Sequence, residues 1–405
     1  MNMDSDCKKV LKVAWIFENL LWWNGGIKYL LEVSSRLRYN CDLDIYTTRV
    51  SAENKAKFND AGVQVKEFSN TSVNSKRYWL LFPFYVLSNT VKLRKQLESY
   101  DVVISTNPTD CLIAAMLENK KISVMYDFNF WLHSADYIKG VHPLLRFFVS
   151  TIRPVARIVD RWAVRKADAI VTICNYTAKM MKKEYGRLPL ILHEGVDPDL
   201  FISKHNMELE RVYSGRTVII HLASYLGPTK GTKYAIKALP EIAKRVPDVL
   251  LLILNASNDV AARKQLLNLA HELGVEANIM FSPPVSDNEL PYYYSLAQVV
   301  IQPSLDENTH LPVEEGAACE TPSVTFKGTL DGEDIIDGIT GFEVPREDVG
   351  SLADAVVRLI RDRELNIKLG ENGRQHIINN FSWQKNAEQM WALINAVVYG
   401  KHQLS

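Results

Sequence analysis

The chain has 405 residues, of which 47% are hydrophobic and 23% are charged, and its formal net charge is zero. That length exceeds what one ordinary hydrophobic core holds, so we expect a globular protein with two domains and no low-complexity tract. The five cysteines (7, 41, 111, 174 and 319) are scattered and odd in number, which disfavours a disulfide framework or zinc site and favours a reducing compartment.

Charge and hydropathy along the chain indicate its surroundings. Residues 1–200 contain seven more basic than acidic side chains, and residues 201–405 contain seven more acidic than basic ones. This asymmetry suggests that the first half meets an anionic partner. The N-terminus has early acidic side chains and no apolar run, so we expect no signal peptide. The uncharged run 78–91 is too short to span a membrane, and we expect a cytoplasmic protein.

The first half alternates strands with helices. A helix is predicted over Gly26–Leu37, directly after the first strand. The predicted strands are Lys12–Phe17, Asp42–Tyr46, Val63–Lys66, Val102–Ser105, Ser123–Tyr126 and Ala169–Ile173. This alternation favours a parallel sheet with right-handed crossovers.

A polar stretch over 203–215 is the predicted linker, and a second alternation follows it. Its predicted strands are Val218–Ala223, Val249–Leu254, Ile279–Phe281, Val299–Gln302 and Ser323–Phe326. Its predicted helices are Lys233–Arg245, Asp259–Leu273, Asn288–Leu296, Pro312–Cys319 and Ser351–Arg361. We therefore expect an α/β protein with two doubly wound domains, 1–205 and 206–378. We expect the active site in the cleft between them, and a C-terminal helix in 379–405 that crosses back to the first domain.

Two glutamates, Glu307 and Glu315, are separated by seven residues. The first follows the predicted strand Val299–Gln302, and the second lies one turn into the helix that Pro312 begins. In an open α/β sheet, ligands bind in the crevice at the carboxyl ends of the strands, where a helix N-terminus also attracts anions. The alternative is that Glu314 and Glu315 only complement the dipole at a helix start.

Several motifs occur in a fixed order along the chain. They are Gly25-Gly26, His193–Phe201, His221–Gly231 with its Lys230-Gly231 pair, Leu290–Tyr294, Gln302–Ser304, the run Glu307–Pro322, Asp337–Phe342 and Phe381–Trp383. With these motifs, the chain resembles the retaining GT-B glycosyltransferases of family 4 over nearly its whole length. The resemblance implies a GT-B fold, in which two Rossmann-like domains face each other across a cleft.

The resemblance also implies roles for individual residues. Lys230 would bind the diphosphate of a nucleotide-sugar donor and stabilise the charge that grows as the sugar leaves. Glu307 would support the donor sugar near its anomeric carbon, and Glu315 would accept hydrogen bonds from the ribose hydroxyls. Further donor contacts are implied for the backbone at Pro284 and Val285 and for the amides of Asn308, Thr309, His310 and Leu311. Gly25 and Gly26 open a helix after the first strand, a geometry that presents backbone N–H groups to a phosphate or the acceptor. The alternative is that this glycine pair only forms a turn.

The sequence departs from the family pattern at three places. Ser224 and Tyr225 occupy the stretch where an Arg usually precedes the lysine, and Glu320 stands where a Gly is usual. The usually glycine-containing run after Glu307 reads Asn-Thr-His, which adds bulk and polarity and allows an unusual donor preference.

The catalytic element of the first half is ambiguous. In the family, a His-containing motif follows the strand that corresponds to Ser123–Tyr126 and contacts the donor sugar. Asp127 and His133 are both candidates here. The alternative for His133 is a structural role within its aromatic segment.

Basic and aromatic residues of the first half predict a membrane contact. Arg153, Arg157, Arg161 and Arg165 recur at every fourth position, which places them on roughly one face of a helix. With apolar neighbours and the basic aromatic segment 76–95, they predict docking on an anionic bilayer. The alternative is a solvated helix face with buried aromatic side chains.

Together these features predict a retaining, metal-independent glycosyltransferase. It would move a sugar from a UDP- or GDP-linked donor to a glycan, lipid-linked or other acceptor in cell-envelope or surface polysaccharide synthesis. We expect no cofactor besides the donor, no metal, no nucleic acid, and a location in the cytoplasm or on the inner face of the membrane. The alternatives are a non-catalytic GT-B subunit that binds a glycan or partner, and a sugar-nucleotide epimerase.

Overall fold

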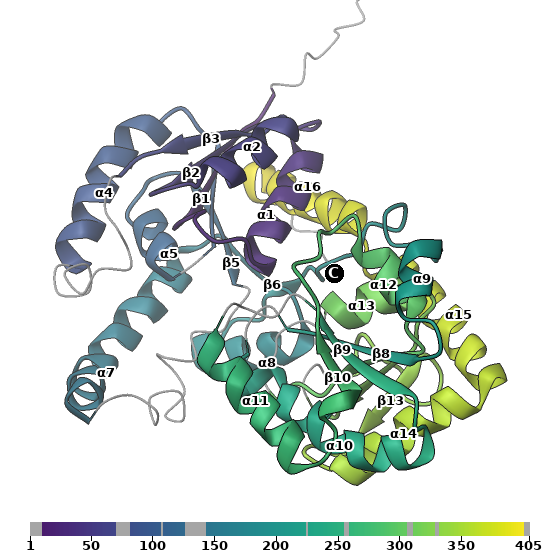
Figure 1. Cartoon of the computed structure of the whole chain (residues 1–405). Helices are drawn as coiled ribbons and strands as arrows, with labels where there is room; N and C mark the ends of the chain where they lie inside the picture. The colour runs from purple at the N-terminus through teal and green to yellow at the C-terminus, as the bar shows by residue number, and fades with distance from the viewer. Residues whose placement is uncertain are drawn as a thin grey trace, which may run out of the picture. The chain divides into compact units, whose positions relative to one another are not determined.

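The computed structural model describes residues 10–69, 82–106, 108–125, 143–223, 226–254, 259–305, 311–328 and 332–400 (Figure 1). It divides into two compact units. The first comprises Met1–Ile173, Thr177–Leu192 and Gln384–Ser405, and the second comprises Cys174–Tyr176 and His193–Trp383.

The first unit is built on a parallel sheet with helices packed against it. In the described residues the sheet has seven strands in the order β3-β2-β1-β4-β5-β6-β7. Its elements are β1 (Lys12–Phe17), α1 (Gly25–Leu37), β2 (Asp42–Thr47), α2 (Ala52–Asp60), β3 (Gln64–Glu67), α4 (Phe82–Leu97), β4 (Val102–Ser105), α5 (Pro108–Ala115), β5 (Lys120–Met125), α7 (Pro143–Lys166), β6 (Ala169–Thr172), α8 (Asn175–Tyr185), β7 (Leu190–Ile191) and α16 (Trp383–Tyr399).

The second unit repeats this plan. Its described residues form a six-stranded parallel sheet in the order β10-β9-β8-β11-β12-β13. Its elements are α9 (Met207–Val212), β8 (Thr217–Leu222), the 3-10 turn η1 (Pro228–Lys230), α10 (Thr232–Arg245), β9 (Val249–Leu254), α11 (Val260–Glu272), η2 (Glu276–Asn278), β10 (Ile279–Phe281), α12 (Leu290–Leu296), β11 (Val299–Gln302), α13 (Leu311–Ala318), β12 (Ser323–Phe326), β13 (Gly341–Val344), α14 (Val349–Arg361) and α15 (Arg363–Asn380).

The sheet of the second unit is buried on both faces. Every residue of β9, Val-Leu-Leu-Leu-Ile-Leu, is buried, as expected for a central parallel strand covered by helices. Alternate residues enter different cores: Leu251 and Ile253 pack with α10 and α14, whereas Leu250 and Leu252 pack with α12 and α13. The predicted α/β class with two doubly wound, Rossmann-like domains is confirmed.

The boundary between the units lies at Leu192–His193 and not at 205–206. The segment predicted as a linker contains α9, which Asn206 caps by accepting hydrogen bonds from the N–H groups of Glu208 and Leu209. The backbone N–H of Val196 donates to Phe381 O at 3.0 Å, which ties the segment before α9 to the second unit. The polarity of this segment predicted a linker. The hydrogen bond between Val196 and Phe381 joins residues far apart in the sequence, so no local pattern could predict it.

Helix α16 belongs to the first unit. The side chain of Asn386 is 2% exposed, accepts a hydrogen bond from Tyr29 Oη at 3.1 Å and donates to Leu192 O at 3.2 Å. Figure 1 shows α16, in yellow, beside α1. The end of the chain thus completes a unit that begins at its start.

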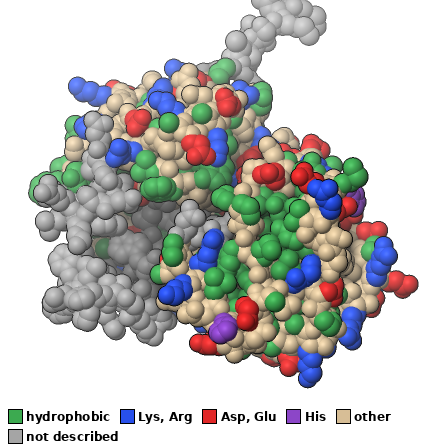
Figure 2. All heavy atoms as spheres, viewed as in Figure 1, with side chains coloured by type: hydrophobic (Ala, Val, Ile, Leu, Met, Phe, Trp, Pro, Cys, Tyr) green, Lys and Arg blue, Asp and Glu red, His purple; other side chains and the backbone are tan. Residues whose placement is uncertain are grey.

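Side-chain charges of both signs are mixed on the surface. On the face shown in Figure 2, acidic and basic side chains are interspersed over the described parts of both units. None of the described helices is long and apolar enough to cross a membrane.

Candidate functional site

The candidate site of the second unit lies where the strand order reverses. Strands β8 and β11 are neighbours, with Val299 beside Ile219 and Val300 beside Ile220. The chain continues from β8 to β9 and β10 on one side and from β11 to β12 and β13 on the other. Such a switch point opens a crevice at the carboxyl ends of the strands, where open α/β sheets bind ligands.

Two loops meet at this switch point. After β8 the chain forms η1, which ends at Lys230, and Gly231 then adopts a left-handed conformation with φ of 73°. A Cβ atom at Gly231 would lie 1.8 Å from Pro303 O, in the loop that follows β11. The N–H of Leu305 donates to Thr229 O at 2.7 Å and holds the two loops together. Lys230 is therefore fixed beside the loop that leads to Glu307.

A buried histidine, His221, forms hydrogen bonds with residues on both sides of this junction. His221 is 0% exposed, and its Nδ1 and Nε2 lie 2.9 Å from Ile301 O and from Thr232 Oγ1. Because a carbonyl only accepts, Nδ1 carries the proton and the Thr232 hydroxyl donates to Nε2. His221 thus links β8, β11 and the first residue of α10.

Glu315 is buried within α13 and is held by a tyrosine of α12. The glutamate is 3% exposed, and the Tyr294 hydroxyl donates to its Oε2 at 2.9 Å. Burial and the neighbouring carboxylate raise the pKa of Tyr294 well above its ordinary value, so the tyrosine stays a donor. This bond fixes one oxygen of the carboxylate, and the implied ribose contact stays a prediction. The sequence contained Tyr294 but gave no sign of this pairing.

The other expected donor contacts in the second unit occupy different environments. Pro284 is exposed, whereas Val285 is buried in the core with Leu290 and Tyr294. Leu311 is half-buried and begins α13, one residue earlier than predicted. The implied contact of the backbone at 284–285 with the donor's base stays a prediction.

In the first unit, the glycine pair begins a helix as predicted. Gly25 and Gly26 are the first residues of α1, and Asn24 caps the helix by accepting a hydrogen bond from Ile27 N at 3.0 Å. They follow β1, which neighbours β4 at the switch point of this sheet. Trp22, in the same loop, is 72% exposed. The backbone of the first helical turn thus lies at the ligand-binding edge of the first sheet.

Six of the predicted site residues lie outside the described residues. They are the catalytic candidates Asp127, His133 and Glu307, and the loop residues Asn308, Thr309 and His310. Their implied roles stay predictions.

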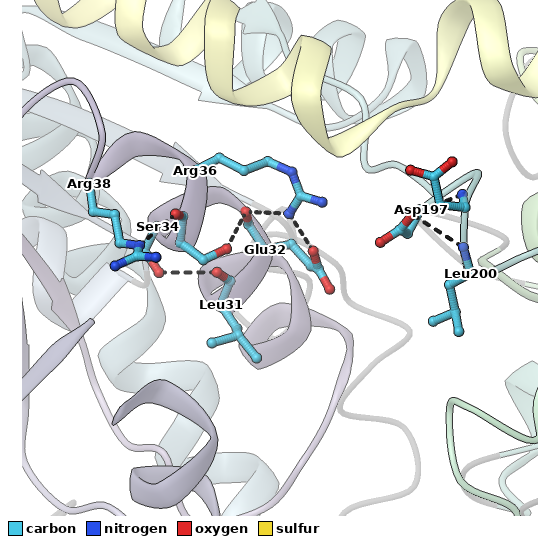
Figure 3. A network of polar contacts seen from close by, with 9 residues as sticks. Leu31, Glu32, Ser34, Arg36, Arg38, Asp197 and Leu200 are labelled. Atoms are coloured by element: carbon cyan, nitrogen blue, oxygen red, sulfur yellow. Dashed lines mark hydrogen bonds and ion pairs between the residues drawn. The ribbon is translucent and has the colours of Figure 1, made fainter. Parts of the chain in front are cut away.

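Sequence reasoning missed a polar cluster in the second unit. Glu333, in the loop after β12, accepts hydrogen bonds from Asn175 N at 2.8 Å and Asn175 Nδ2 at 2.7 Å. The same carboxylate lies 3.5 Å from His193 Nε2. His193 belonged to a recognised motif, but its partners come from distant parts of the chain. Turn geometry elsewhere in that motif is local: the Asp197 carboxylate accepts the N–H groups of Asp199 and Leu200 (Figure 3).

Glu320, which stands where the family usually has Gly, adopts a left-handed conformation with φ of 64°. It follows the last turn of α13, and the next residue, Thr321, donates its N–H to Gly316 O at 2.9 Å. This is a helix end of the kind that glycine favours, which explains the family preference in conformational terms.

Glu320→Gly is therefore expected to stabilise the second unit. A non-glycine residue in this conformation costs about 1 kcal/mol, so Tm should rise by about 2–4 °C in calorimetry. Glu320→Ala is the matched control, because it removes the same carboxylate and keeps the unfavourable φ. Equal Tm values for the two variants would contradict the conformational explanation.

Two family models match the chain in consecutive segments. Glycosyltransferase Family 4 matches residues 23–200, and Glycosyl transferases group 1 matches residues 206–376. The two segments together extend over both units.

Curated relatives share between a quarter and a third of their residues with the chain. A GDP-mannose-dependent alpha-(1-6)-phosphatidylinositol monomannoside mannosyltransferase of Mycolicibacterium smegmatis is 29% identical over 254 residues, which make up 60% of this chain and 66% of that protein. A D-inositol 3-phosphate glycosyltransferase of Corynebacterium glutamicum is 27% identical over 279 residues, 66% of each protein. The matches thus span just under two thirds of these relatives.

Solved structures share the fold at low sequence identity. HepE of Anabaena, solved with UDP and glucose, has a TM-score of 0.77 at 16% identity and covers 95% of this chain and 100% of its own. Sucrose-phosphate synthase of Thermosynechococcus elongatus has a TM-score of 0.76 at 15% identity and covers 96% and 100%. With its two Rossmann-like sheets and its two consecutive family matches, the chain belongs to the family 4 glycosyltransferases and has the GT-B fold.

Proposed function

We propose that the protein is a retaining hexosyltransferase that uses a UDP- or GDP-linked sugar and needs no metal. The observation that carries this proposal is the junction at Gly231, which fixes Lys230 beside the loop leading to Glu307. The M. smegmatis relative is named for GDP-mannose, and HepE was solved with UDP and glucose, so both bases are candidates.

In the proposed reaction, positively charged and N–H groups that are already in position stabilise the departing diphosphate. The bond between the anomeric carbon and the diphosphate oxygen breaks, and the acceptor oxygen forms its bond on the same face of the sugar. The acceptor's proton passes to the departing diphosphate oxygen, so no dedicated base is required. Lys230 and the backbone N–H groups at the start of α13 would stabilise the negative charge on the diphosphate.

We also propose the setting of this reaction. The acceptor would be a glycan or a lipid-linked molecule used in cell-envelope or surface polysaccharide synthesis, and the protein would act in the cytoplasm or at the inner face of the membrane. The phosphatidylinositol mannoside in the name of the M. smegmatis relative supports a lipid-linked acceptor.

A thermal-shift panel with UDP, GDP, ADP and their sugars tests the donor class. A ligand stabilises only the state that it binds, so one base should raise Tm selectively, by an amount that grows with ligand concentration. Product analysis with that donor should then show transfer or slow hydrolysis with retained configuration. A protein that no nucleotide stabilises would favour the non-catalytic alternative, and an epimerised nucleotide sugar would favour the epimerase.

Tyr294→Phe is expected to weaken nucleotide binding. It removes the hydroxyl that fixes the Glu315 carboxylate, which should raise the Kd for the nucleotide about tenfold and destabilise the fold by about 1–3 kcal/mol. Isothermal titration with the selected nucleotide measures the first effect. Tyr293→Phe, at the half-buried neighbouring position, is the control and should change neither. Unchanged binding by Tyr294→Phe would separate Glu315 from the nucleotide.

A further inference from the structure

Helix α4 of the first unit leaves a stripe of apolar side chains exposed. Phe84, Leu87 and Val91 are 71%, 53% and 64% exposed, and their spacing of three and four residues places them on one face. The opposite face of α4 is buried: Val86, Leu93 and Leu97 pack in the core with residues of β1 and β4. The helix is therefore apolar on two sides, and the described residues pack against only one of them.

Helix α7 has the same organisation. Val155, Ile158, Val159 and Trp162 are 62%, 65%, 37% and 42% exposed, again at spacings of three and four residues. On its other side, Ala163 and Val164 are buried with residues of α5 and α8. Helix α5 contacts both α4 and α7, so the two stripes belong to one layer of helices, which Figure 1 shows on the left.

The arginines predicted to face lipid turn out to have another role. Arg157 Nη2 lies 2.8 Å from Glu184 Oε2, and Arg161 Nη2 lies 2.7 Å from Glu184 Oε1, so both hold α7 against α8. The side chain of Arg153 is outside the described residues, and Arg165 remains exposed. The exposed face of α7 is instead apolar. The prediction failed because positions four residues apart drift around a helix, and because the sequence did not show which side of α7 packs against α8.

Within α4 and the described part of α7, the exposed charged side chains are basic, and the exposed Glu98 lies just beyond the end of α4. On α4, Lys92 is exposed next to Val91, and Lys95 is exposed one turn beyond Val91. On α7, Arg165 and Lys166 follow Trp162 by three and four residues and are exposed. Helix α4 contains no acidic residue. The acidic residue of α7, Asp160, is 7% exposed and accepts a hydrogen bond from Tyr185 Oη at 2.7 Å.

We propose that the outward faces of α4 and α7 dock on the surface of an anionic phospholipid bilayer. Helices that lie in the interface combine an apolar face with flanking Lys and Arg, and anionic headgroups attract the basic ends. A second copy of the chain would present a surface of the same basic charge, so charge complementarity favours the anionic bilayer as the occupant. The proposal concerns a surface of the first unit and does not depend on the proposed transfer reaction.

Vesicle flotation of the full-length protein tests the surface directly. Vesicles of phosphatidylglycerol and phosphatidylcholine in equal parts should carry the protein upward, and pure phosphatidylcholine vesicles should carry much less. Leu87→Gln with Ile158→Gln should lower the partition coefficient at least tenfold, and Lys92→Gln with Lys166→Gln should lower it only on anionic vesicles. Raising the salt concentration should weaken binding to anionic vesicles.

The matched control is Val260→Gln with Leu267→Gln, at two exposed apolar positions of α11 in the second unit. It should bind vesicles like the parent protein, and all variants should keep the parental Tm because the changed positions are exposed. Failure to bind either vesicle, or an equal loss in the control, would overturn the proposal. So would sedimentation showing a dimer that Leu87→Gln with Ile158→Gln dissociates, which would identify a second copy as the occupant. No substrate is present, so this result is independent of the thermal-shift panel.

Discussion

Replacing Lys230 by methionine is expected to lower kcat by about two to three orders of magnitude. The ammonium group is proposed to stabilise charge that is greatest on the departing diphosphate, and removing one such preorganised group typically has an effect of this size. Because the interaction grows as the sugar leaves, kcat and kcat/KM should fall together. Steady-state kinetics with the donor selected by the thermal-shift panel measures both constants.

The fold should survive this change. Lys230 ends the short turn η1 and is half-buried, and methionine retains most of its aliphatic length. Lys237→Met, at an exposed position of the following helix α10, is the control and should leave kcat unchanged. If Lys230→Met kept the parental kcat and the parental Tm, Lys230 would have no part in the reaction, and the proposed stabilisation of the diphosphate by this lysine would be wrong.

Gly231→Ala is expected to be the most damaging single substitution at the site. The left-handed conformation costs a residue with a Cβ about 1–2 kcal/mol, and the new methyl group would lie 1.8 Å from the carbonyl oxygen of Pro303. Backbone cannot rotate away as a side chain can, so the two loops must separate, at a further cost of about 1–3 kcal/mol. We expect a lower Tm of the second unit and loss of nucleotide binding, measured by calorimetry and titration.

Gly274→Ala separates the two causes. Gly274 has a similar φ of 67°, but a Cβ there would meet nothing within 4 Å. It should therefore show the conformational cost alone, keep nucleotide binding, and lose less stability than Gly231→Ala. If the two variants behaved alike, the contact between Gly231 and Pro303 would have no energetic importance.

The sequence predicted the buried strands well because their signal is local. The bounds of β1, β4, β9, β11 and β12 agree with the predicted ones to the residue, since a central parallel strand is a largely apolar run. The bounds of β10 also agree, although it is an edge strand and is not buried. The two-residue strand β7 and the half-buried strand β13 were not predicted, because neither has such a run. Helix α9 was not predicted, because it lies in a polar stretch and has no buried apolar residues.

The candidate site was predictable in its location but not in its contacts. Lys230 and Glu315 could be placed at the carboxyl edge of a sheet by counting strands and helices. The contact of Gly231 with Pro303 and the bond from Tyr294 to Glu315 join positions far apart in the sequence, and no periodicity encodes them. The arginine spacing on α7 predicted that these side chains share one face of the helix. Only the ion pairs with Glu184 showed that this face lies against α8.

The position of α16 has a consequence for the order of assembly during synthesis. Asn386, Met390 and Ile394 are buried in the unit that holds the first strand, and the ribosome adds them only after the residues of the second unit. The second unit, which ends at Trp383, has all its residues before α16 emerges. Although domains usually mature from the N-terminus onward, here the nascent N-terminal unit stays incomplete until the second unit has been synthesised.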